Sequence, residues 1–132
     1  MVTIVSRHST GFTGVKQAIP GGPLYECDIL NVIDAANMII GTRKCQKDLR
    51  ALSKDEKDLR CIIKNAVKHG RFHQSEWCEL SKPDTWAACD SYKFTEITWI
   101  EAARKEMECE FYVKFCIGIS NNIVITISYH TS

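Results

Sequence analysis

The spacing of apolar residues predicts a strong helix in the middle of the chain. Leu59, Ile62, Ile63, Ala66 and Val67 recur at helical intervals and form one stripe. Ser53-Lys-Asp-Glu56 has the form of a capping box, and Gly70 follows the last residue of the pattern. We therefore expect an amphipathic helix over residues 54–69.

A second helix is expected over residues 29–40, which are apolar on most sides. Asp28 can cap its start and Gly41 can follow its end. A helix that is apolar all round is buried, so this one should lie in the core. Residues 1–26 show no clear period and contain the turn signal Ile19-Pro-Gly-Gly-Pro23.

The last third of the chain is rich in residues that favour strands. We expect strands over residues 92–99, 110–119 and 123–130, with a hairpin loop at Ser120-Asn121-Asn122 and a short helix or loop over 100–107. Helices followed by antiparallel strands indicate an α+β fold. The expected architecture is one domain over residues 1–132, with N-terminal helices packed on a small C-terminal antiparallel sheet. Residues 1–26 would be irregular, 27–71 helical and 72–132 mostly antiparallel β.

Strand alternation separates the two faces of the predicted hairpin. A three-residue loop pairs Ile119 with Ile123, so the matched apolar pairs would be Ile117–Ile125 and Phe115–Ile127. The same register places polar pairs on the opposite face, namely Tyr112–His130, Lys114–Ser128 and Cys116–Thr126.

The polar face has the groups needed to cleave RNA through its own 2′-hydroxyl. His130 can remove or return a proton, because imidazole titrates near neutral pH. Lys114 can stabilise charge on the phosphorane, Tyr112 can position the phosphate, and Ser128 can contact it. This chemistry needs no metal or other cofactor. The alternative reading is the ordinary solvent-facing side of a half-buried sheet.

Composition indicates a globular protein, and its charge is unevenly distributed. The 132 residues are 45% hydrophobic and 25% charged, which excludes a disordered tail. The net charge of +1 conceals residues 42–71, which have ten basic and four acidic side chains and a net charge of +6. Such a basic region predicts an anionic partner, either nucleic acid or an acidic protein. A solvated helix face is the alternative. The predicted RNA-binding residues from this region are Lys57, Arg60, Lys64, Lys68 and Arg71.

Cysteine and histidine spacing gives little support for a metal site. The seven Cys residues form no C-x-x-C unit, so we expect reduced and mostly buried thiols, with a single catalytic Cys as a less favoured alternative. His69 and His73 have H-x-x-x-H spacing, but Gly70 should end the helix between them. We therefore assign His73 to phosphate contact. Since no membrane span or secretion signal is evident, the expectation is a cytoplasmic protein with no membrane partner.

Several short motifs occur in an order that resembles the MqsR toxins, endoribonucleases of toxin–antitoxin pairs with a RelE-like fold. The motifs are Phe72-His-Gln-Ser75, Trp86 before Asp90-Ser-Tyr92, the strand Glu110–Phe115, and Ile125–His130 at the end. The resemblance covers about residues 54–130. It implies that Tyr112 is the active-site Tyr, that His130 and Gln74 stand where the family has Lys, and that a protein antitoxin is the partner.

The leading hypothesis is therefore a metal-independent endoribonuclease toxin. His130, Tyr112 and Lys114 would be catalytic, and the basic helix with Arg71, His73, Gln74 and Ser128 would bind RNA. The alternative is a non-catalytic phage or mobile-element inhibitor that binds a nucleic-acid enzyme or nucleic acid through its basic helix.

Overall fold

A computed structural model describes residues 1–131 of the chain. The three helices among these residues are α1 (Ile29–Val32), α2 (Arg43–Ala51) and α3 (Glu56–His69). The seven strands are β1 (Thr3–Ile4), β2 (Ala18–Ile19), β3 (Asn37–Ile40), β4 (Arg71–Glu79), β5 (Thr85–Ile100), β6 (Lys105–Ile117) and β7 (Ile123–Thr131).

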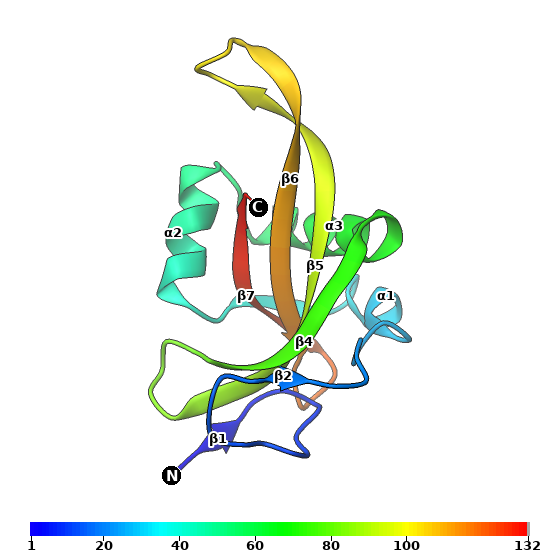
Figure 1. Cartoon of the computed structure of the whole chain (residues 1–132), viewed down its shortest axis with the longest axis vertical. Helices are drawn as coiled ribbons and strands as arrows, with labels where there is room; N and C mark the ends of the chain where they lie inside the picture. The colour runs from blue at the N-terminus through cyan, green and yellow to red at the C-terminus, as the bar shows by residue number, and fades with distance from the viewer. Residues whose placement is uncertain (132) are drawn as a thin grey trace.

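All seven strands belong to one mixed sheet, which organises the whole molecule (Figure 1). Its order is β2-β4-β5-β6-β7-β3, and β1 pairs with the start of β5. From β4 to β7, each strand is antiparallel to its neighbour, whereas β3 is parallel to β7 and β1 is parallel to β5. The long helix α3 crosses behind this sheet in the view of Figure 1, and α2 packs beside β7.

The expected architecture of N-terminal helices over a small C-terminal sheet is wrong. Strand accounts for 44% of the chain and helix for 21%, and three strands come from the first 40 residues. The predicted helix over 29–40 is instead the single turn α1 followed by strand β3. A short apolar run suits a buried strand as well as a helix. Here β7 offers a free edge, and residues 37–40 pair with it.

Helix α3 follows the predicted amphipathic pattern closely. Leu59, Ile62, Ile63 and Ala66 are buried against the sheet. The capping box differs from the expected one, because Asp55 and Asp58 exchange side-chain-to-backbone hydrogen bonds of 2.8 and 3.0 Å. The helix therefore begins at Glu56 and ends at His69, within two residues of the prediction.

The β6–β7 register is partly as predicted and partly shifted by a bulge. Tyr112 pairs with His130 and Lys114 with Ser128, as expected. Beyond Lys114 the register changes, so Phe115 pairs with Thr126 and Ile117 with Val124. The predicted pairs Phe115–Ile127, Cys116–Thr126 and Ile117–Ile125 are therefore wrong. Ile127 is the extra residue of β7, opposite no residue of β6, so the irregularity is a β-bulge.

The first 26 residues are held to the sheet by a buried carboxylate. Asp90 on β5 is fully buried and accepts hydrogen bonds from the backbone N–H groups of Leu24 and Tyr25 at 2.9–3.0 Å. The Ser75 hydroxyl donates a further bond of 2.6 Å to the same carboxylate. These bonds fix the segment that connects β2 to α1.

The β5–β6 hairpin continues past the helices as a projecting arm (Figure 1). Residues 100–107, expected to form a short helix or loop, are instead the end of this hairpin. Its tip is a turn over residues 101–104, in which Arg104 has a φ of 51°. No side chain between Thr95 and Glu110 is buried.

Candidate functional site

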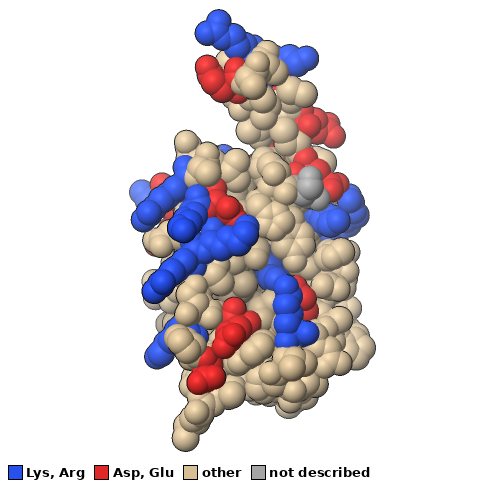
Figure 2. Space-filling view, turned by 60° about the vertical axis from the view of Figure 1, so that its left-hand side comes forward, with Lys and Arg blue, Asp and Glu red and all other residues tan. Residues whose placement is uncertain are grey.

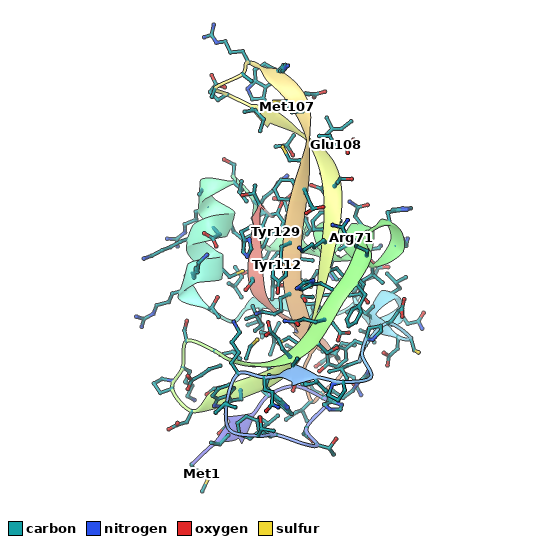
Figure 3. All side chains as sticks on the ribbon, in the orientation of Figure 1. Met1, Arg71, Met107, Glu108, Tyr112 and Tyr129 are labelled. Carbon is teal, nitrogen blue, oxygen red and sulfur yellow. The ribbon has the colours of Figure 1, made fainter. Side chains whose placement is uncertain are left out.

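Two rows of polar side chains cross the sheet face that lies opposite α3. The register of β4 to β7 aligns four residues in each row, because paired residues point to the same face. The first row is Arg71, Lys93, Tyr112 and His130, and the second is Gln74, Ser91, Lys114 and Ser128. Figure 3 shows Arg71 and Tyr112 over these central strands.

Strand alternation explains why this face is polar. Tyr129, next to His130 in the chain, points to the opposite face, where its ring stacks on Phe111 at 5.5 Å. Phe94 belongs to the same aromatic cluster and lies against Gly70 at the end of α3. Helix α3 therefore covers the aromatic face and does not cover the face that carries Tyr112.

Tyr112 lies between two imidazoles. Its ring is stacked on His130, with centroids 4.9 Å apart and an interplanar angle of 16°. His73 meets the same ring edge-on at 6.0 Å. His73 sits at the irregularity of β4 and His130 on β7, so the two histidines approach β6 from opposite sides. The cluster thus combines two groups capable of proton transfer with one phenol.

Hydrogen bonding at His130 and burial at Tyr112 act on the protons of these two rings. His130 Nδ1 lies 2.9 Å from the carbonyl oxygen of Thr131. Because a carbonyl oxygen only accepts, a hydrogen bond at this contact places a proton on Nδ1 and turns Nε2 toward other partners. Burial raises the pKa of the Tyr112 phenol above its ordinary value, although a hydrogen bond with Ser91 acts in the other direction. Tyr112 is therefore a protonated donor at neutral pH.

Lys114 is not a free cation on this face. Its Nζ lies 2.9 Å from Oε1 of Glu76, and the two side chains are only 7% and 8% exposed. Burial acts to lower the pKa of Lys114, but Cys78, the hydrogen bond with Glu76 and the nearby Tyr112 together outweigh burial and raise the pKa. Lys114 therefore remains charged, and Glu76 neutralises it locally.

A pocket of about 360 Å³ adjoins the second polar row. Lys114 and Ser128 lie on its sheet side, next to the Tyr112–His130 pair, and Trp86 supplies an aromatic wall. Two exposed lysines, Lys16 and Lys44, lie at its margin. The remaining lining residues are Thr42, Cys78, Glu79 and Ile127. An aromatic side chain beside cationic groups suits a nucleotide, since a base can stack and a phosphate can pair.

The basic helix does not belong to this site. Because α3 covers the opposite face, Lys57, Arg60, Lys64 and Lys68 lie across the sheet from Tyr112. Arg60 donates hydrogen bonds to the carbonyl groups of Ile33, Asp34 and Ala36. Lys64 forms an ion pair of 2.8 Å with Asp34. The structure therefore does not bring this helix to the face of His130, where it was expected to hold phosphates, and two of its cations have structural partners.

Among the other predicted RNA-binding residues, His73, Gln74 and Ser128 do reach the polar face. Arg71 also reaches it, but an ion pair of 2.8 Å with Glu110 engages its guanidinium. The sequence reasoning missed Lys93, Ser91 and the partner of Lys114. Strand alternation within residues 92–99 puts Lys93 on the face opposite Tyr92 and Phe94, and this pattern could have identified it. Nothing in the sequence near Glu76 indicates its contact with Lys114.

The cysteines give no candidate nucleophile on this face. All seven are free thiols; Cys27 and Cys61 are exposed, and Cys45, Cys78, Cys89 and Cys116 are buried. Cys78 lines the pocket, but its hydrogen bond with Cys89 and its burial raise its pKa strongly. A thiol with a raised pKa is a poor nucleophile at neutral pH.

Comparisons with protein-family models, curated proteins and solved structures found no match to this chain. The MqsR-like resemblance therefore stays a prediction that rests on its motifs. Over residues 1–131, no helix has the length and apolar character to cross a membrane. In the same described range, no three His, Cys, Asp or Glu side chains gather in an arrangement that could hold a metal ion.

Proposed function

We propose that the protein is a metal-independent endoribonuclease that cleaves single-stranded RNA through attack of the 2′-hydroxyl. The observation that carries this proposal is the placement of Tyr112 between His130 and His73. Two imidazoles on either side of one phenol can supply the base and the acid that this reaction needs. Lys93 and the protonated phenol add positive potential and a hydrogen-bond donor next to them.

In the proposed reaction, Nε2 of His130 removes the proton of the 2′-hydroxyl. The 2′-oxygen attacks the adjacent phosphorus, the bond to the 5′-oxygen breaks, and His73 donates a proton to that leaving oxygen. Tyr112 donates a hydrogen bond to a non-bridging oxygen, where negative charge increases in the transition state. The products are a 2′,3′-cyclic phosphate and a free 5′-hydroxyl.

The pocket beside Ser128 provides a place for the nucleotide next to the scissile bond. Its volume of about 360 Å³ lies in the range of small-molecule sites. Trp86 can stack on a base, while Lys16 and Lys44 can attract the backbone. Lys114 contributes to this pocket as part of its buried ion pair with Glu76, not as an isolated catalytic cation.

The test is RNA cleavage in EDTA by the wild type, by three variants of the cluster and by one variant of the pocket. His130→Ala and His73→Ala should each reduce the cleavage rate by about 100- to 10,000-fold, the usual contribution of a general acid or base. Tyr112→Phe should reduce it less, because the ring remains and only the donor is lost. Trp86→Ala should mainly raise KM. End analysis should detect the cyclic phosphate.

His69→Ala is the matched control, because His69 is exposed at the end of α3, away from the polar face. It should cleave like the wild type, and all variants should keep the wild-type circular dichroism spectrum. Full activity of His130→Ala would contradict the mechanism. Absence of cleavage by the wild type, both on naked RNA and with ribosomes present, would contradict the function.

One observation favours the non-catalytic alternative. Lys57 and Lys68 on α3 face solvent, and neither has an ion pair with another residue in the range 1–131. A protein that docks on nucleic acid through this helix would lose binding on Lys57→Glu and Lys68→Glu substitution, yet be indifferent to His130→Ala. The antitoxin partner implied by the resemblance is part of the proposal only if cleavage is found.

A further inference from the structure

The projecting arm of the β5–β6 hairpin presents apolar side chains that no other part of residues 1–131 covers. Ile97 is 72% exposed and Trp99 is 55% exposed, and cross-strand pairing places both on one face with Glu106 and Glu108. Met107 is 40% exposed on the other face. Figure 3 shows Met107 and Glu108 on the hairpin beyond the rest of the sheet. An isolated two-stranded ribbon is only marginally stable in water, so a partner would stabilise it.

Acidic side chains surround the exposed apolar residues of the arm. Residues 96–108 contain four acidic side chains and two basic ones, a net charge of −2. Both basic residues, Arg104 and Lys105, are at the turn, whereas Glu106 and Glu108 flank Trp99 and Ile97. Trp99 Nε1 already donates a 2.8 Å hydrogen bond to Glu101, so the indole has its polar group satisfied and its ring available.

The complementary surface lies on the same chain, between α2 and the start of α3. A groove of about 400 Å³ there has Ile40 and Leu49 among its lining residues, with Arg50, Lys54 and Lys57 around them. The groove also includes Gln46, Asp55 and Glu56, of which Asp55 is engaged in the capping box of α3. Residues 43–57 have six basic and three acidic side chains, a net charge of +3. Figure 2 shows the basic side chains gathered over this part of the body, below the arm.

We propose that the arm of one molecule docks into this groove of a second copy, and that the two copies do so reciprocally. The arm extends away from its own body, so it cannot fill its own groove (Figure 1). A two-fold dimer uses each contact twice, which doubles the area buried by Ile97 and Trp99. Trp99 is the expected anchor, because aromatic rings in apolar pockets dominate interface energies. The inference is independent of the proposed ribonuclease activity.

The experiment is sedimentation equilibrium of the full chain over a wide concentration range at low and high salt. The wild type should dimerise, with weaker association at high salt because the contact joins opposite charges. Trp99→Ala should raise the dimer Kd by at least about tenfold. Arm variant Glu106→Lys/Glu108→Lys and groove variant Arg50→Glu/Lys54→Glu should each be monomeric.

Mixing the two charge-reversed variants gives the decisive readout. The reversed arm then faces a reversed groove, and the unmodified arm faces an unmodified groove, so an equimolar mixture should recover the dimer. Lys68→Glu and Ile119→Asp change exposed positions outside the proposed contact and should leave the dimer intact. A wild type that is monomeric at every concentration would overturn the inference. A dimer that resists the arm and groove substitutions, or a mixture that stays monomeric, would overturn it equally.

Discussion

Replacing Lys114 with Met tests whether the buried ion pair is structural. The Lys114 side chain is 7% exposed and Glu76 is 8% exposed, and their charged atoms are 2.9 Å apart. Removing the lysine leaves a buried carboxylate without its cation, which costs about 3–5 kcal/mol of unfolding free energy. For a domain of this size, that corresponds to a fall in Tm of roughly 10–20 °C.

Urea denaturation followed by circular dichroism measures this loss, and a double-mutant cycle separates the pair from its surroundings. Glu76→Leu combined with Lys114→Met removes both charges and should recover most of the loss, because an apolar pair of similar size avoids the unpaired charge. A Lys114→Met variant that loses less than about 1 kcal/mol, or a double variant no better than the sum of the singles, would refute this reasoning.

The pH dependence follows from the raised pKa of Lys114. A lysine with a raised pKa in the folded state stabilises the fold fully below its unfolded value of 10.5, and that contribution is lost as the pH rises further. The stability difference between wild type and Lys114→Met should therefore be constant near neutral pH and shrink above about pH 10.5. In the RNA assay, a stable but inactive double variant would show that the Lys114–Glu76 pair is also needed for cleavage.

Three further predictions concern the fold. Asp90→Ala should cost about 2–5 kcal/mol in urea unfolding and expose the segment before α1 to limited proteolysis, because it leaves two backbone N–H groups and a serine hydroxyl without their acceptor. Gly70→Ala should destabilise by about 1–3 kcal/mol, since a Cβ there would lie 2.5 Å from the carbonyl oxygen of Lys93; an unchanged urea midpoint would contradict that contact. In a thiol titration of the native protein, Cys27 and Cys61 should react quickly, while the buried thiols react only on unfolding.

Strand alternation along the chain was enough to predict part of the candidate site. Tyr112 and His130 were assigned to one face and paired correctly, because their strands are adjacent in the chain and joined by a short loop. His73 was predicted to contact phosphate, but only the sheet order brings it to Tyr112. Glu76 was missed, because it lies 38 residues from Lys114 and nothing near either residue indicates the pair.

By itself, the sequence determined the features that depend on neighbours along the chain. These are the amphipathic helix α3, the strands β6 and β7, and the alternation that separates Tyr112 from Tyr129. Tertiary structure decided which sheet edges the N-terminal segments occupy, and it placed α3 on the face opposite the histidines. The physical reason is that local periodicity states which face of an element is apolar, but not which partner covers it. That choice depends on the free edges and uncovered apolar faces that the rest of the chain leaves.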